Sequence, residues 1–127
     1  MTEQDERNIA TVRKMYEGDL TERANIAADI LWHVPGHNPV SGEYRGFKEY
    51  TELMPSRMAP LTRWDFALES IMVNGDYVMT TFSLQGERNG KGINIRGGHL
   101  MRVKDDKVVE GWGFTDQQDL LDDFFTD

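Results

Sequence analysis

The sequence contains no cysteine, and its 127 residues include only three histidines. Without cysteine there is no disulfide, no thiolate metal ligand and no cysteine nucleophile. Basic residues are also scarce, because 14 Lys and Arg stand against 22 Asp and Glu, for a formal net charge of -8. Nucleic acids and anionic membranes attract clustered positive charge, so we expect neither as a partner. Any catalysis must then rely on His, carboxylate, Tyr or backbone groups.

Long hydrophobic runs are absent as well. No segment is apolar over the roughly 20 residues that a membrane-spanning helix needs. Residues 1–7 are charged where a signal peptide would be apolar, and these features predict a cytoplasmic protein. The length and the 39% hydrophobic content suit one domain with a real core, and we expect it to span residues 1–127.

The first half of the chain shows helical periodicity around one strand-like segment. Apolar residues recur every three or four positions over residues 9–16, which predicts a helix. A second helix is expected to begin near Asp19 and to merge at its end into an apolar strand that carries His33 and stops at Pro35 and Gly36. Its candidate buried residues are Leu20, Ala24, Ala27, Ala28 and Leu31. A third helix, over residues 47–54, should end at Pro55, which lacks the N–H that a helix interior needs.

From residue 62 onward the apolar residues alternate, which predicts four strands joined by turns at Asn74–Gly75, residues 89–92 and residues 104–107. One face of the first strand should hold Trp64, Phe66, Leu68, Ser70 and Met72, with Ala67, Ile71 and Val73 opposite. One face of the third should hold Ile93, Ile95, Gly97, His99, Met101 and Val103. A final helix is expected after Asp116, which would cap it, with the inward residues Leu120, Leu121, Phe124 and Phe125.

This order of elements is an α+β plan, with a curved antiparallel sheet packed on one side by helices. Trp32–Gly36 with Gly42–Gly46, Gly98–Val103, and Lys107–Trp112 leading to Asp116 resemble motifs of the nuclear transport factor two-like superfamily. Within it, the chain is most similar to SnoaL-like or ketosteroid-isomerase-related proteins. The resemblance implies a single conical barrel, in which a strongly curved sheet wraps around N-terminal helices and encloses an apolar pocket. It also implies a homodimer formed through the outer face of the sheet.

Two positions depart from these relatives. Similar ketosteroid isomerases carry a general-base Asp beside the proline that ends the first strand, whereas Val34 and Gly36 flank Pro35 here. Similar polyketide cyclases place a catalytic Asp on the last strand, at a position that aligns with Gly113. Only their histidine is matched, by His99. The resemblance therefore implies the fold without transferring either activity intact.

The histidines are the candidate catalytic residues. Alternation places His33 and His99 among apolar neighbours, so both imidazoles are expected to face the interior. A neutral imidazole exchanges protons near neutral pH, and two in one cavity would serve as base and acid. The alternative is that each is a core histidine bonded to a backbone carbonyl. His37, Tyr44 and Arg45 are expected at the rim.

Large aromatic and methionine side chains should form the pocket wall. The pocket-lining candidates are Tyr16, Trp32, His37, Tyr50, Trp64, Tyr77, Met79, Met101 and Trp112. Trp32 and Trp112 should divide between pocket and dimer interface, in an order that the pattern leaves open. Glu110 is expected to be solvated or dimer-facing, with orientation of a histidine as an alternative, and Arg96 to form an outer-face ion pair.

No metal site is predicted, because Pro35 breaks the helix that would align His33 with His37, and no cofactor is expected. These features predict a protein that binds a small hydrophobic carbonyl-bearing or cyclic metabolite. Cofactor-independent acid/base chemistry by His33 and His99 would make it an isomerase, cyclase or dehydratase. Two alternatives remain open: a noncatalytic ligand-binding protein and an accessory dimerisation domain.

Overall fold

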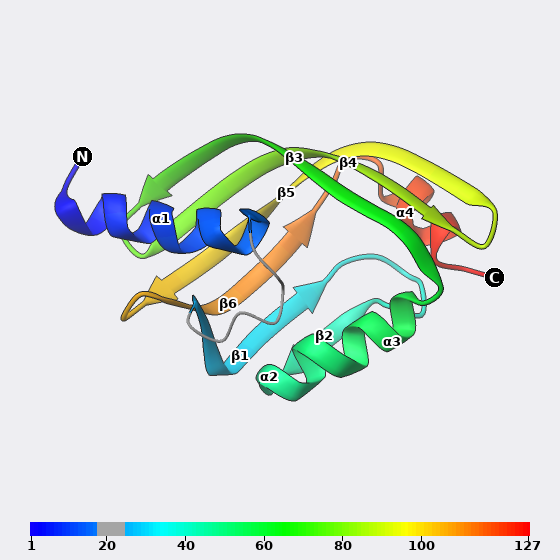
Figure 1. Ribbon diagram of the computed structural model, residues 1–127, viewed down its shortest axis with the longest axis horizontal. Helices are drawn as coiled ribbons and strands as arrows, with labels where there is room; N and C mark the ends of the chain where they lie inside the picture. Colours follow the sequence, from blue (N-terminus) through cyan, green and yellow to red (C-terminus); the bar gives the residue numbers. More distant parts are fainter. Residues whose placement is uncertain (18–24) are drawn as a thin grey trace.

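The computed structural model describes residues 1–17 and 25–127, and it has an α+β architecture built on one six-stranded sheet (Figure 1). The helices are α1 (Glu3–Glu17), the continuous segment α2 (Gly46–Lys48), η2 (Glu49–Leu53) and α3 (Met54–Met58), and α4 (Gln118–Phe124). The strands are β1 (Ile26–Val34), β2 (Gly42–Arg45), β3 (Leu61–Asn74), β4 (Tyr77–Arg88), β5 (Lys91–Lys104) and β6 (Lys107–Phe114). In the described part of the chain, no helix is long and apolar enough to cross a membrane.

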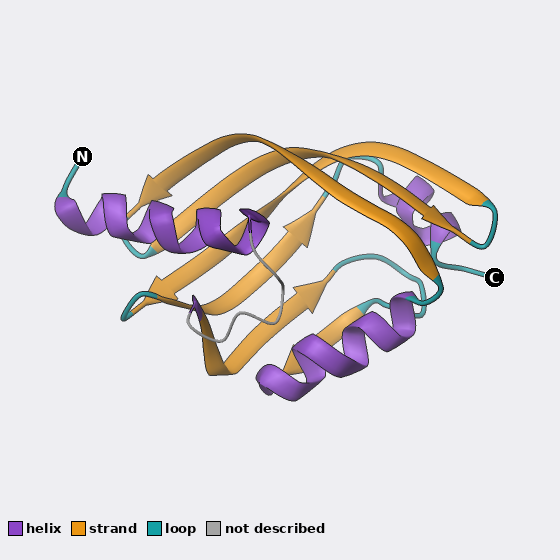
Figure 2. Ribbon diagram, in the orientation of Figure 1, coloured by secondary structure: helices purple, strands orange, loops and turns teal. Residues whose placement is uncertain are grey.

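The strand order across the sheet is β2-β1-β6-β5-β4-β3. Neighbouring strands are antiparallel except β1 and β6, which are parallel. Figure 2 shows the strands curving around one side, where α1 and the helical segment at residues 46–58 lie. The α+β expectation is therefore confirmed, with a mixed sheet whose edges are β2 and β3.

Residues 26–34 form a strand rather than the end of a second helix. Alanine and leucine favour a helix locally, but this segment pairs with β2 on one side and β6 on the other. Those ladders, together with burial of Ile26 and Ile30, outweigh a weak local preference. The predicted caps and buried positions over residues 19–24 lie outside the described residues.

Pro55 lies inside the helical segment instead of ending it. A π-helical turn comes directly before it, and the N–H of Met54 donates to the carbonyl oxygen of Glu49. The wider turn accommodates the proline ring, and Pro55 occupies the first turn of α3, where its missing N–H costs little. The segment therefore continues to Met58 and places Tyr50 in the core.

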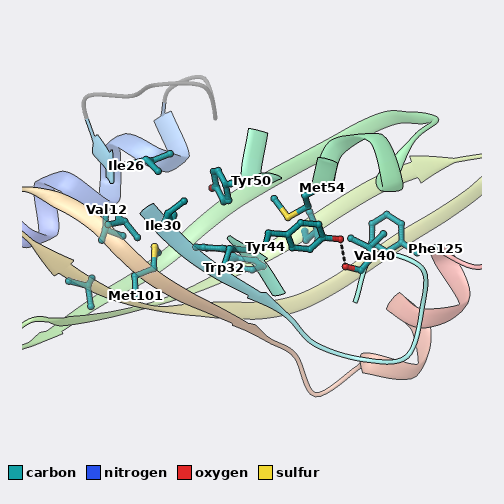
Figure 3. Packing of buried hydrophobic residues seen from close by; sticks show 14 of the residues in the cluster. Val12, Ile26, Ile30, Trp32, Val40, Tyr44, Tyr50, Met54, Met101 and Phe125 are labelled. Carbon is teal, nitrogen blue, oxygen red and sulfur yellow. Dashed lines mark hydrogen bonds between the residues drawn. The ribbon is translucent and has the colours of Figure 1, made fainter. Parts of the chain in front are cut away.

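Tyr44 lies in the core rather than at a rim. Pairing of β2 with β1 turns this side chain inward, and its hydroxyl donates to the carbonyl oxygen of Val40 at 2.6 Å (Figure 3). The bond fastens the preceding loop to the strand. His37 and Arg45, the other two residues expected at the rim, are exposed to solvent.

A β-bulge divides β3 into two halves. The pairing register with β4 shifts between Leu68 and Ser70, and an extra residue turns the following side chains to the other face. Ile71 and Val73 therefore pack on the core, whereas Met72 is 48% exposed. The predicted faces of this strand are correct before the bulge and wrong after it.

The predicted turns and the alternation of β5 agree with the structure. Asn89 and Gly90 form the β4–β5 turn with φ angles of 50° and 76°, as a tight hairpin requires. The β3–β4 turn uses Gly75 and Asp76, one residue later than predicted. On β5 the buried residues of the predicted face are Ile93, Ile95, Met101 and Val103.

The C-terminal helix closes one end of the core and is held by polar contacts. The Arg88 guanidinium, which is buried, donates to the carbonyl oxygens of Met58 and Phe124. Asp122 accepts a hydrogen bond from the backbone N–H of His37 at 3.0 Å. These bonds tie α4 both to the end of α3 and to the loop after β1.

Asp116 does not cap this helix. The cap position is occupied by Gln117, and the Asp116 carboxylate instead lies 2.7 Å from the Arg96 guanidinium. The outer-face ion pair expected of Arg96 is therefore confirmed. The cap prediction is wrong, because the ion pair holds the carboxylate two residues before α4 begins.

Candidate functional site

A cavity of about 600 Å³ lies between the concave face of the sheet and the helices. Its wall comes from α1, the helical segment at residues 46–58, α4, β1 and strands β3–β6. Most of the lining is apolar, as Met15, Leu84, Ile95 and Phe125 illustrate. Small-molecule sites typically enclose about 300–1,000 Å³, so this cavity has the size of a metabolite site.

The imidazole of His99 lies in this cavity among four aromatic rings. Its centroid is 4.9 Å from that of Phe82, 5.1 Å from that of Trp32, and 5.8 Å from those of Phe66 and Tyr16. The alternation of β5 turns His99 inward, and the bulk of the rings excludes water from most of its surface. The surroundings therefore disfavour a charged imidazole.

Two hydroxyl groups, which we call the hydroxyl chain, connect His99 to α1 and β4. The Tyr16 hydroxyl is 2.5 Å from Nδ1 of His99 and 2.6 Å from Oγ1 of Thr80. Thr80 is fully buried, and its Oγ1 accepts the backbone N–H of His99 at 3.2 Å. Nδ1 is thus fixed by the protein. Among the residues that the structure describes, Nε2 has no hydrogen-bond partner.

Burial sets the protonation of these groups. It lowers the pKa of His99 to about 3, so the imidazole is neutral at physiological pH. Burial also raises the pKa of Tyr16, only partly offset by the hydrogen bond to Thr80, so the phenol keeps its proton. The site therefore presents a neutral imidazole, held at one nitrogen by a neutral hydroxyl.

The imidazole of His33 lies on the opposite face of the sheet, contrary to the expectation that both rings share the cavity. Gly111 faces the inner side of the sheet, because a Cβ there would overlap the Trp32 ring, so its neighbour Trp112 points outward. The His33 ring stacks on Trp112 with a centroid distance of 5.1 Å and an angle of 3°. His33 borders the cavity through β1, while its side chain belongs to the outer face.

Carboxylates occupy both sides of the His33 ring. Nε2 is 2.8 Å from Glu110, and Nδ1 is 3.5 Å from Glu43. Glu110 also lies 4.0 Å from Arg102. Glu110 therefore lies on the outer face, where its carboxylate orients the His33 ring.

The other predicted lining residues divide between the two faces. The cavity wall includes Tyr16, Trp32, Tyr50, Trp64 and Met101. The residues placed elsewhere are His37, Tyr77, Met79 and Trp112. His37 sits in an exposed loop, and Tyr77 and Met79 alternate with buried neighbours on β4, which turns them outward. Trp32 thus belongs to the cavity and Trp112 to the outer face.

Thr80, Phe66 and Phe82 are site residues that no motif marked. Thr80 and Phe82 follow Val78 at every second position of β4, so the strand alternation alone places them on the inner face. The contact of Thr80 with Tyr16 joins residues 64 positions apart. Only the folded chain reveals that pair.

Comparison with known proteins identifies the family of this chain. The model of the SnoaL-like domain matches residues 8–111, which is most of the chain.

The chain belongs to the SnoaL-like domain family.

Solved structures agree on the fold. A protein of unknown function with a cystatin-like fold from Xanthomonas campestris is 26% identical, with a TM-score of 0.83 over 94% of this chain and 98% of that one. Bal32a, from a soil-derived mobile gene cassette, is 22% identical, with a TM-score of 0.86 over 96% and 98%. A candidate SnoaL-like polyketide cyclase from Jannaschia sp. CCS1 is 15% identical, with a TM-score of 0.79 over 100% and 97%. No curated protein matches this sequence.

Within this SnoaL-like domain, Gly113 lies directly opposite His99 in the β5–β6 ladder. A Cβ at Gly113 would be 3.7 Å from Cδ2 of His99 and 3.4 Å from Cδ of Pro35, which are ordinary contacts. A side chain that begins with a Cβ at this position would therefore start beside Cδ2 of the imidazole without a clash at that atom. In this chain that space is left open to the cavity.

We predict that Gly113→Asp raises the pKa of His99 by about 1–3 units, because a carboxylate at this distance stabilises the imidazolium form. The measurement is an NMR titration of the His99 ring. In the unmodified protein the His99 ring should stay neutral as the pH is lowered to 5. In the variant, protonation of the ring should begin at a higher pH than in the unmodified protein. Gly113→Asn, of the same shape without the charge, is the control. Equal pKa values in the two variants would contradict the proximity of position 113 to His99.

Proposed function

We propose that this SnoaL-like protein binds a small hydrophobic, carbonyl-bearing or cyclic metabolite and catalyses a cofactor-independent proton transfer on it. Isomerisation, cyclisation and dehydration are reactions of this class. One observation carries the proposal: a neutral His99 stands in an apolar cavity, fixed at Nδ1 by Tyr16 and with no partner for Nε2 among the described residues. A positioned imidazole of this kind can exchange a proton or a hydrogen bond with a bound molecule.

The cavity supports a ligand that is mainly apolar and flat. Aromatic walls such as Trp32, Trp64 and Phe82 match ring systems, and the volume of about 600 Å³ suits a metabolite. The similarity to a candidate SnoaL-like polyketide cyclase supports the same class of cyclic, oxygen-bearing compound. With His33 on the outer face, His99 is the histidine that acts on the ligand.

A noncatalytic binding protein is the second candidate. The observation that favours it is the absence of a contact between His99 and any carboxylate among the described residues. The position beside the ring is Gly113, so the described residues supply no charged partner that would stabilise an imidazolium during a reaction. In that case the same cavity would bind its ligand without turnover.

Proton exchange on a cyclic ketone separates the two candidates. We propose 2-tetralone as the probe, because it is a small apolar ring compound with exchangeable protons beside its carbonyl group. In D₂O, the protein should accelerate deuterium incorporation at those carbons on the order of 100-fold over His99→Leu, the size expected of one acid or base group. The incorporation is followed by proton NMR.

The control is His37→Leu, which removes an exposed histidine and should leave the exchange rate unchanged. Binding of 2-tetralone is followed separately through the fluorescence of Trp32 and Trp64, which line the cavity. Saturable binding with equal exchange rates in the wild type and His99→Leu would establish the noncatalytic candidate instead. A folded wild type that does not bind 2-tetralone would overturn both the catalytic and the noncatalytic candidate.

We also propose that two copies associate through the outer face of the sheet. Residues directly opposite one another form a row across four strands, which we call the outer stripe: Met72, Met79, Leu100 and Trp112. Met72 and Met79 are 48% and 38% exposed, and the neighbouring Tyr77 and Phe114 are 44% and 42% exposed. An exposed apolar patch of this kind is typical of a protein interface.

Met79→Glu should convert the dimer into a monomer, because it buries an unpaired carboxylate in the centre of that interface. Analytical ultracentrifugation should give about twice the chain mass of 14.6 kDa for the wild type and the chain mass for the variant. Ser56→Glu, which makes the same charge change on the exposed side of α3, is the control. A monomeric wild type, or a dimer that persists in Met79→Glu, would contradict this interface.

A further inference from the structure

The positions of the hydrogen atoms in the hydroxyl chain decide what His99 offers to the cavity. A neutral imidazole carries one proton, on either Nδ1 or Nε2, and the partner of Nδ1 determines which. Here that partner is the Tyr16 hydroxyl, at 2.5 Å, which can donate or accept. Tyr16 in turn meets Thr80 at 2.6 Å. In two arrangements of protons the Tyr16 hydroxyl donates to one of these neighbours and accepts from the other.

In the first arrangement each proton of the chain lies in a hydrogen bond of ordinary length or shorter. The backbone N–H of His99 donates to Thr80 Oγ1 at 3.2 Å, Thr80 donates to Tyr16, and Tyr16 donates to Nδ1. His99 then carries its proton on Nε2, where it faces the cavity as a hydrogen-bond donor.

In the second arrangement the bonds run the other way. Nδ1–H donates to Tyr16, and Tyr16 donates to Thr80. The Thr80 proton is then left with the carbonyl oxygen of His99, 3.4 Å away, which exceeds the usual range of about 2.5–3.0 Å for an O–H···O bond. Nε2 would carry a lone pair.

The basicity of the acceptors favours the first arrangement as well. An imidazole nitrogen is a far stronger hydrogen-bond acceptor than an alcohol oxygen, and a phenol is a better donor than an alcohol. The first arrangement joins the phenol of Tyr16 to the imidazole nitrogen. In the second arrangement the phenol donates to the hydroxyl of Thr80, which is a weaker acceptor than the imidazole nitrogen.

We infer that Tyr16 and Thr80 are positioning residues that fix His99 in its Nε2–H tautomer, so that the cavity presents a neutral N–H donor. This inference rests on the proposed function and deepens it, because such a donor selects a ligand with an acceptor oxygen. The ligand class is then apolar ring compounds that carry a carbonyl group. In the complex the same N–H polarises the carbonyl group of the ligand, so His99 acts as a hydrogen-bond donor to the carbonyl oxygen.

Two other polar groups of the cavity wall fit the same class. The hydroxyl of Tyr50 and the indole N–H of Trp32 have no hydrogen-bond partner among the described residues, and both residues line the cavity. Indole is a donor only, and burial raises the pKa of Tyr50, which keeps its phenolic proton. Among the described residues, the unpaired polar groups near His99 are therefore donors.

The tautomer is read directly by nitrogen-15 NMR of the imidazole, in which protonated and bare ring nitrogens differ strongly in chemical shift. The wild type should show a protonated Nε2 and a bare Nδ1 on His99. Tyr16→Phe, which removes only the hydroxyl, should lose this single pattern and populate Nδ1–H. Thr80→Ser keeps its hydroxyl and should keep the wild-type pattern. A wild type protonated on Nδ1, or a pattern unchanged in Tyr16→Phe, would overturn the inference.

Ligand preference is tested with 2-acetylnaphthalene and 2-ethylnaphthalene, which share a ring system and differ in the carbonyl group. The ratio of their dissociation constants should favour the ketone roughly 3- to 10-fold more in the wild type than in His99→Leu, as expected for one hydrogen bond. An equal ratio in both proteins would overturn the inferred donor role.

The inferred tautomer of His99 and the proposed function can be contradicted separately. If the wild type holds Nδ1–H but binds the ketone through His99, the tautomer is wrong and the proposed function stands. If the wild type holds Nε2–H but neither naphthalene binds, the tautomer stands and the proposed function is lost, and with it the carbonyl ligand class.

Discussion

The hydrogen bond between the Tyr16 hydroxyl and Nδ1 of His99 is the contact on which the arrangement of the site depends. It joins the end of α1 to the centre of the sheet, and Thr80 holds the same hydroxyl from β4. Removing it would leave α1 in place through its apolar face, with Val12 fully buried, but would leave the imidazole without a fixed partner. The bond thus connects packing of the first helix to the chemistry of the cavity.

Strand alternation explains why His33 and His99, the two histidines on strands, have different surroundings. His99 is enclosed by aromatic rings and is neutral, whereas His33 lies between Glu43 and Glu110 on the outer face. On β1 the inward position is taken by Trp32, so the next residue, His33, points to the outer face. The same alternation that builds the cavity therefore removes His33 from it.

Much of the fold was predictable from periodicity and turn chemistry, because alternation over β4 to β6 and the Asn89–Gly90 turn are local signals. The errors arise where pairing or packing over long distances decides. Sheet pairing converts residues 26–34 into a strand, a bulge after Leu68 exchanges the faces of β3, and a π-helical turn carries the helix past Pro55. The site shows the same division: His99 was identified from its strand, but its link to Thr80 exists only after folding.

The most direct test of the central claim is a crystal structure of the protein with 2-acetylnaphthalene bound. We expect the ring system between Trp32 and Phe82, with the carbonyl oxygen at a hydrogen-bond distance of about 2.7–3.2 Å from Nε2 of His99. Density for the probe on the outer stripe with an empty cavity, or in the cavity with its carbonyl group turned away from His99, would contradict it.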